Sequence, residues 1–382
     1  MIVNRGGYTD EQITQVLRDF NGSREVDFRY DLLNMDEIKI GELEGITSAR
    51  ISYSDFRVIK RSVTFELDEH FRKDINFLTD RVQPWVILHM PDGGVVEWSL
   101  GIFLMESPRL FANGAHKTRS IGAYDKTLVL EQYRLMNRLL FSRGTNYVAA
   151  IEALISMAGI AQMNITTSGH QFPHDFELPV GTSAREAINI LLTAINYSSL
   201  HVDSAGYVRA GPYILPSQRR PTFHYSANEN SIIAPKMDES LDIAGRANVF
   251  IRVADSLELD TPLKSTFIND DINSRLSTVR RGRAIVDFDK VGNIASQSAL
   301  DGLVRRLAVE STSAFRHLTF STILLPNHGS TETLLIDIPD FFDIPMTFVE
   351  TAWEMDLRVG GLMKHPILRK NRHPNHEMVA KV

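Results

Sequence analysis

The chain has 382 residues, of which 43% are hydrophobic and 23% are charged, the proportions of an ordinary globular protein. Its formal net charge of −6 argues against non-specific nucleic-acid binding as its main task. The absence of cysteine excludes disulfides, thiolate metal sites and cysteine nucleophiles. At roughly 150 residues per domain, the length predicts two or three domains.

The N-terminal residues contain no apolar stretch of the kind that a signal peptide needs. The longest apolar-rich run, residues 147–163, is amphipathic and too short to cross a bilayer, so we expect no membrane insertion. A short amphipathic helix is predicted over residues 9–20, with Thr9 as its N-cap and Gln12 completing a capping box.

Residues 24–135 carry the signals of β-strands. Residues 63–68 alternate apolar and polar side chains, and residues 82–108 form two apolar runs joined by the turn Pro91–Gly94. A further run with strand character follows over residues 118–132. Together these runs predict a small antiparallel sheet domain.

The pattern changes after residue 135, where residues 146–160 and 182–198 have apolar side chains at helical spacing. A hairpin that turns at Asp203–Gly206 follows, and the last third returns to strands around one helix, residues 295–312. We therefore predict an α+β, β-rich fold in which two antiparallel β domains are separated by a small α/β insert. The expected parts are an N-terminal helix (1–23), a first β domain (24–135), the insert (136–213), a second β domain with one helix (214–370) and a flexible tail (371–382).

One stretch near the C-terminus has a nearly strict two-residue period. From Val349 to Val359 one face is mainly apolar, whereas the other carries Glu350, Glu354 and Asp356. Such alternation predicts a long strand with one face packed on a core and one charged face in water.

The sequence offers few motifs that carry catalysis or bind a cofactor. No phosphate-binding loop and no Gly-x-Ser-x-Gly are present. His365, His373 and His376 cluster near the C-terminus, where we interpret them as part of a polar tail rather than a metal site. Carboxylate pairs such as Asp287 and Asp289 fit a solvated strand face better than a glycosidase centre. We predict no catalytic, cofactor-binding or metal-binding residue.

The segment DIPDFFDIPMTF, residues 337–348, places Phe341 and Phe342 between two Ile-Pro steps. Proline restricts the backbone and removes a hydrogen-bond donor, so the segment is predicted to be a loop. Adjacent phenylalanines in a loop are either tucked beneath it or presented to a partner. Phe341 and Phe342 are therefore candidates for a partner contact.

The order of elements carries more information than any single motif. NYVAAIEALISMAGI is followed by LPVGTSAREAINILLTAINYSSLHVDSAGYVRAGPY, which reads as a helix, an extended piece, a capped helix and a strand pair. With the closing segment FVETAWEMDLRVGGLMKHPILRK, this order resembles the baseplate-hub and tail-tip hub proteins of bacteriophages. The resemblance covers roughly residues 25–370.

This resemblance implies a homotrimer in which each chain carries two β domains similar to tail-tube subunits, barrel- or sandwich-like in form. Three such chains would make a pseudo-sixfold ring between the tail tube and the tail tip. Glu350, Glu354 and Asp356 would line an acidic lumen through which DNA passes without sticking. The implied partners are further copies of the chain, a distal tail or tube protein, the tape measure protein and a tail-tip or needle protein.

The resemblance also implies a location in the virion, after synthesis in the cytoplasm of the bacterial host, and a structural protein rather than an enzyme. Two other classes stay open on the sequence alone. A receptor- or carbohydrate-binding tail module would need an aromatic platform, but only three tryptophans are present and two lie in alternating strands. A tail-associated cell-wall hydrolase would need a catalytic centre that no motif indicates.

Overall fold

The computed structural model describes residues 3–19, 24–71, 74–229, 231–241, 245–254, 262–313 and 316–369. Antiparallel strands dominate it, with few helices, which confirms the predicted β-rich α+β fold. The predicted tail, residues 371–382, lies outside the described residues. None of the helices within the described ranges is long and apolar enough to cross a membrane.

The first β block follows a short strand, β1 (Val3–Asn4), and helix α1 (Asp10–Arg18). The helix begins as predicted, because the Thr9 hydroxyl accepts from the backbone of Gln12 and the Gln12 side chain bonds back to Thr9. The block contains β2 (Glu25–Leu33), β3 (Lys39–Glu42), β4 (Ile46–Ser54), β5 (Arg61–Asp68), the 3₁₀ turn η1 (Glu69–Phe71), β6 (Arg81–His89), β7 (Val95–Ser99), β8 (Phe103–Asn113) and β9 (His116–Tyr124).

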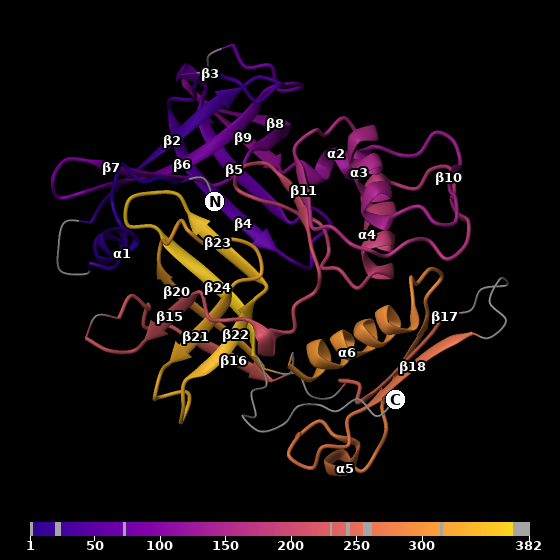
Figure 1. Cartoon of the computed structure of the whole chain (residues 1–382). Coiled ribbons are helices and arrows are strands. Elements are labelled where there is room, and N and C mark those ends of the chain that lie inside the picture. The colour runs from indigo at the N-terminus through magenta and orange to yellow at the C-terminus, as the bar shows by residue number, and fades with distance from the viewer. Residues whose placement is uncertain are drawn as a thin grey trace.

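An α/β unit with its own apolar core follows the first block. Its helices α3 and α4 pack against each other, and α2 packs on α4 (Figure 1). The elements are α2 (Thr127–Gln132), β10 (Leu139–Phe141), α3 (Tyr147–Met157), β11 (Met163–Ile165), β12 (Phe176–Leu178), α4 (Ala184–Ala194), β13 (His201–Val202), β14 (Val208–Ala210) and the 3₁₀ turn η2 (Pro216–Gln218).

The second β block contains β15 (Phe223–Ser226), β16 (Asp238–Leu241), β20 (Arg316–Ile323), β21 (Thr333–Asp337), β22 (Met346–Glu350), β23 (Ala352–Asp356) and β24 (Leu362–Arg369). A further α/β unit is inserted between β16 and β20. In it, α6 packs across the three-stranded sheet β18-β17-β19 (Figure 1). The elements of this unit are β17 (Val249–Ala254), β18 (Leu263–Ile268), α5 (Thr278–Arg281), β19 (Val286–Lys290) and α6 (Gln297–Ser313). The predicted helix is therefore α6, and it belongs to a unit that the sequence did not reveal.

The two β blocks have closely similar strand orders. In the first block β2 pairs with β6, β6 with β7 and β8, β8 with β9, β9 with β5, and β5 with β4. In the second block β15 pairs with β21, β21 with β22, β22 and β23 with β24, β24 with β20, and β20 with β16. Corresponding strands also follow one another in the same chain order. The structure thus contains two closely similar β architectures. They differ in that β15–β21 is parallel where β2–β6 is antiparallel, and in that β22 pairs with β24 where β6 pairs with β8.

The blocks are joined edge to edge by β4 and β23, which pair antiparallel from Ser54↔Ala352 to Arg50↔Asp356 (Figure 1). This junction creates a continuous run of eight antiparallel strands, β8-β9-β5-β4-β23-β24-β20-β16. Four of these strands come from each block. We call this run the eight-stranded layer.

Candidate functional site

One face of the eight-stranded layer is mainly polar. Because facing residues in adjacent strands share a face, the strand register assigns each side chain to one side. The apolar side is buried, and its members include Ile51, Tyr53, Val63, Phe65, Ile121, Leu318, Phe320, Trp353, Met355 and Met363. The opposite side, which we call the polar face, is at least partly exposed and includes Arg50, Ser52, Ser62, Thr64, Glu66, Ser120, Gly122, Asp238, Thr319, Ser321, Glu354, Asp356 and Lys364.

Small hydroxyl side chains and carboxylates dominate the polar face. At the junction between the blocks, Arg50 on β4 bonds Asp356 on β23 at 2.8 Å and lies 3.4 Å from Glu354. The two predicted carboxylates therefore share one cation, and the carboxylates of the face outnumber its cations. The result is a weakly acidic surface made mainly of small polar side chains, on which Phe111 of β8 and Leu362 of β24 are the large apolar side chains with the most exposure among the described residues.

The predicted strand over residues 349–359 is interrupted at Thr351. Its pairing with β24 shifts by one residue between Glu350↔Ile367 and Glu354↔Lys364, which is the signature of a β-bulge. One extra residue reverses the side-chain phase, so Glu350 points into the core whereas Glu354 and Asp356 lie on the polar face. The prediction that Glu350 faces solvent is wrong, because its exposed fraction is 0%.

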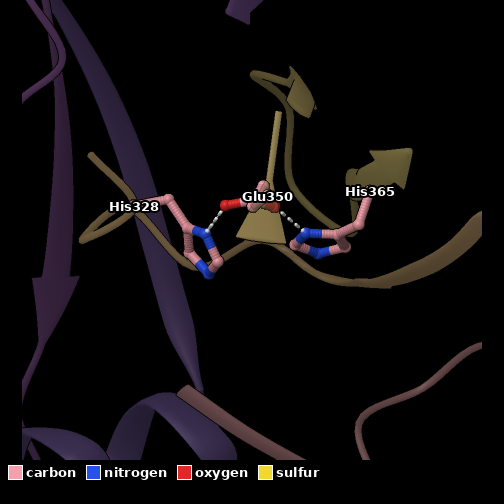
Figure 2. A group of neighbouring side chains, drawn as sticks. All are labelled: His328, Glu350 and His365. Atoms are coloured by element: carbon pink, nitrogen blue, oxygen red, sulfur yellow. Dashed lines mark hydrogen bonds and ion pairs between the residues drawn. The ribbon is translucent and has the colours of Figure 1, made fainter. Parts of the chain in front are cut away.

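Glu350 instead joins two buried histidines in the core of the second block (Figure 2). Its Oε2 lies 2.6 Å from Nδ1 of His328, and its Oε1 lies 2.6 Å from Nδ1 of His365. The outer ring nitrogens are also bonded: Nε2 of His328 to the Tyr225 hydroxyl at 2.8 Å, and Nε2 of His365 to the Thr322 hydroxyl at 2.9 Å. All ring nitrogens and both carboxylate oxygens of this group, the Glu350 cluster, thus have partners.

The Glu350 cluster ties together segments that are far apart in the sequence. His365 and Thr322 come from β24 and β20 of the eight-stranded layer, whereas Glu350 and Tyr225 come from β22 and β15 behind it. His328 lies between β20 and β21, with its ring stacked on another aromatic ring at 3.8 Å between centroids. Because the cluster bonds both layers, it fixes the position of the layer that carries the polar face.

The charge state of the cluster follows from its hydrogen bonds. Burial alone would raise the pKa of Glu350, but the charge and hydrogen bonds of His328 and His365 outweigh burial and lower that pKa to about 2. An ionised carboxylate only accepts hydrogen bonds, so both Nδ1 atoms carry a proton. Burial lowers the pKa of His365, which favours a neutral ring.

Two histidines and a glutamate are also a ligand set that zinc prefers, and their donor atoms lie within 4.8 Å of one another. The spacing does not fit that role. Two ligands on a tetrahedral zinc with bonds of about 2.0–2.1 Å lie roughly 3.3 Å apart. The Nδ1–Oε separations of 2.6 Å are instead those of charge-assisted hydrogen bonds. The arrangement is that of a proton-linked structural cluster.

The buried groups predict that the protein loses stability in mild acid. His365 and His201 have pKa values lowered by burial, for His201 to about 4 with help from the charge of Lys60. A base with a lowered folded-state pKa is protonated first in the unfolded chain, so stability falls as pH drops below about 6.5. The lowered pKa of Glu350 adds a further loss below about 4.5. Asp125, whose pKa burial raises, acts in the opposite direction and reduces the effect.

The measurement is the urea midpoint of unfolding between pH 7 and pH 4. We expect a steady decrease, and a midpoint that stays constant or rises over this range would contradict the assignment of neutral buried histidines.

Solved structures with the same fold identify the kind of scaffold that carries the polar face. The tail protein from Neisseria meningitidis MC58 aligns with a TM-score of 0.65 over 90% of this chain and 97% of its own, at 12% identity. The chain has the fold of phage tail proteins. The 43 kDa tail protein of prophage MuSo2 from Shewanella oneidensis gives a TM-score of 0.62 over 89% of this chain and 98% of its own, at 12% identity. Prophage tail protein gp18 from Listeria monocytogenes EGD-e gives a TM-score of 0.55 over 88% of this chain and 94% of its own, at 10% identity.

No family model matches the sequence, and no curated protein matches it either. Identities of 10–12% explain why the likeness is visible in the fold rather than in the sequence. The resemblance to phage tail proteins that the order of elements indicated is confirmed at the level of the fold.

On this tail-protein fold, the predicted partner loop divides into two roles. Phe342 is 6% exposed and packs on Phe348, with 5.6 Å between the ring centroids, so the predicted partner contact is wrong for Phe342. It is an anchor that holds the loop on the core. Phe341 is 37% exposed, and a partner contact through it stays a prediction.

The other groups noted in the sequence take structural places. His365 belongs to β24 rather than to a tail, and only the structure brings it to His328, while His373 and His376 lie outside the described residues. Asp287 is bonded to Arg252 at 3.0 Å. His328 and Tyr225 were missed, because His328 is 22 positions from Glu350 and Tyr225 is 103 positions from His328, so no local spacing marks them.

Proposed function

We propose that the protein is a structural component of a phage tail, a hub whose copies join into a ring around a central lumen. The observation that carries the proposal is the duplicated strand order, together with the β4–β23 junction. In this proposal the two blocks joined edge to edge are two steps of one rotation, and repetition of a step whose rotation closes gives a ring. Three copies with two blocks each would match a sixfold tube on one side and a threefold tip on the other.

The size of such a ring supports a lumen. Eight strands from each of three copies give a barrel of 24 strands. At about 4.8 Å between strands, its circumference is at least about 115 Å and its backbone diameter at least about 37 Å. Strand tilt widens it further. Packed sheets lie ~10 Å apart, so the side chains of one sheet narrow the lumen by about 5 Å on each side. The width that remains has space for duplex DNA.

The polar face is the inner wall in this proposal. Its apolar opposite side is covered by the rest of the molecule except at the β8 and β16 edges, where Leu110 and Leu241 are exposed. Glu354, Asp356, Glu66 and Asp238 give the wall an excess of negative charge, which repels the phosphate backbone. Short hydroxyl side chains offer no pocket to which a passing strand could bind.

The proposal places the protein in the virion, between a distal tail or tube protein and a tail-tip or needle protein, with the tape measure protein in the lumen before DNA passes. It assigns no enzymatic activity, because the buried ionisable cluster in the second block has no surface access. Trp98 and Trp353 are 2% and 1% exposed, so they offer no platform for a sugar ring.

Light scattering combined with negative-stain imaging tests the proposed function. We expect a mass of three times the 43.1 kDa of one chain and ring-shaped particles with a central hole. The ring-shaped particles should become more abundant as the protein concentration rises, as for any association equilibrium. A monomer over the whole accessible concentration range, with no rings on the grids, would overturn the ring.

A further inference from the structure

The eight-stranded layer ends in two edges that have no strand beside them within the described ranges. At one end is β8, which pairs with β6 only at Phe103 and Leu104 and has no partner strand on its outer edge from Arg109 to Asn113 within the described residues. At the other end is β16, which pairs with β20 on its inner side. Open edges of this length are templates for pairing with another chain.

The duplicated architecture specifies what belongs at these edges. In the first block Ser62–Asp68 pair with Tyr124–Thr118, and in the second block His317–Ile323 pair with Leu368–Leu362, in both cases as seven consecutive pairs. Matching these two ladders row by row makes β4 equivalent to β16 and β23 equivalent to β8. Within the chain, β4 pairs with β23. By the same step, β16 should pair with β8 of another copy.

Resting on the proposed ring, we propose that β16 of one copy pairs antiparallel with β8 of the next copy and so forms each contact between chains in the layer. The row-by-row match also sets the register. Ser52 faces Glu354 within the chain, and the corresponding pair between copies is Ser240 facing Arg109 of the neighbour. Arg50↔Asp356 becomes Asp238 opposite Phe111 of the neighbour.

Charge complementarity supports this junction. Asp238 lies on the polar-face side of β16, and Arg109 lies on the polar-face side of β8. In the proposed register they are diagonal neighbours, within reach of a long side chain. Within the chain, Arg50 and Glu354 are diagonal neighbours in the same way and lie 3.4 Å apart. The proposed junction between copies thus has an ion pair at the same place as the one inside the chain, with the acidic and basic residues exchanged between the two strands.

Apolar exposure at the two edges supports it as well. Leu110 is 46% exposed and Phe111 is 49% exposed on β8, and Leu241 is 54% exposed on β16. Pro108 and the bulge before Arg109 prevent pairing with the first part of β8, so the open ladder has a defined start. A neighbouring β16 would cover these apolar side chains and complete the backbone hydrogen bonds.

Disulfide trapping tests the junction in the full chain, which has no cysteine of its own. The test variants are Ser240→Cys with Arg109→Cys, and Asp238→Cys with Phe111→Cys. On oxidation we expect covalent dimers and trimers in non-reducing gels. The matched control is Ser240→Cys with Leu110→Cys, because Leu110 is as exposed as Phe111 but points to the other side of the strand.

We expect about tenfold more covalent trimer from the test pairs than from the control, because a disulfide requires Cα atoms within about 7 Å and converging Cβ atoms. Ser52→Cys with Glu354→Cys, facing residues inside one chain, verifies the oxidation by peptide mass spectrometry. Equal trapping in test and control pairs, or none in the test pairs, would overturn the β8–β16 junction. If light scattering still gives a trimer in that case, the proposed ring stands with another contact; if it gives a monomer, both fail.

Discussion

Replacing Glu350 with alanine is expected to remove about 3–5 kcal/mol from the free energy of unfolding, because breaking a buried ionic group leaves its partners uncompensated. The Nδ1–H groups of His328 and His365 would each lose the carboxylate oxygen that accepts their hydrogen bond at 2.6 Å. Both rings are buried, so no water replaces the carboxylate without a rearrangement of the core. Urea unfolding followed by tryptophan fluorescence measures the change.

Glu350→Gln should cost less than Glu350→Ala, since the amide keeps the volume and one acceptor oxygen. The histidine that faces the amide NH₂ must then switch tautomer and carry its proton on Nε2. His365 can do this because the Thr322 hydroxyl donates to the carbonyl of Ile323 at 2.7 Å, so the Thr322 oxygen can accept from Nε2–H. The control is Glu354→Ala, four positions along the same segment but on the polar face, where an exposed ion pair contributes about 0–1 kcal/mol. Equal losses for Glu350→Ala and Glu354→Ala would show that the cluster does not stabilise the core.

The contrast between Glu350 and Glu354 also marks the limit of sequence reasoning. A two-residue period predicts the buried and exposed sides of Ala352–Asp356 because side chains alternate along any strand. It cannot reveal the extra residue at Thr351, since a bulge depends on how the partner strand is held. One inserted position moved Glu350 from the predicted wet face to the core.

Features that depend only on residues close together in the sequence were predicted correctly. The capping box of α1 follows from Thr9 and Gln12 alone. The run over residues 118–132 failed in its second half: residues 127–132 are apolar enough for a strand, but they form α2 because they pack on α4 of the α/β unit. A short apolar run is ambiguous between strand and helix until its packing partners are known.

The duplicated strand order could not be read from the sequence for a different reason. Strand order is a property of hydrogen bonding between distant segments, and similar sheets accept different apolar side chains at matching positions. The α/β unit between β16 and β20 further separates two strands whose counterparts, β4 and β5, are neighbours in the chain. The Glu350 cluster shows the same limit, because its members meet only after two layers pack.

Trp353→Ala is the second change with a large expected effect, and it acts on the junction between the blocks. Trp353 on β23 is 1% exposed and stacks on Tyr53 of β4, with 5.8 Å between centroids. Its indole N–H donates to the carbonyl of Gly329 at 2.8 Å, and the Arg61 guanidinium lies 5.3 Å from the ring. Truncation of a buried tryptophan costs about 3–5 kcal/mol.

Hydrogen exchange distinguishes a weakened junction from general destabilisation. In Trp353→Ala, amides of β4 and β23 should exchange faster, whereas those of α3 should keep their protection, because α3 lies in the separate core of the α/β unit. Trp353→Phe is the matched control, since it keeps an aromatic ring on Tyr53 but loses the bond to Gly329 and part of the buried ring volume. Uniform acceleration in β4, β23 and α3 would mean that Trp353 supports the whole fold. Selective acceleration would mean that the contact between the two blocks depends on the same edge-to-edge packing that a ring would repeat between copies.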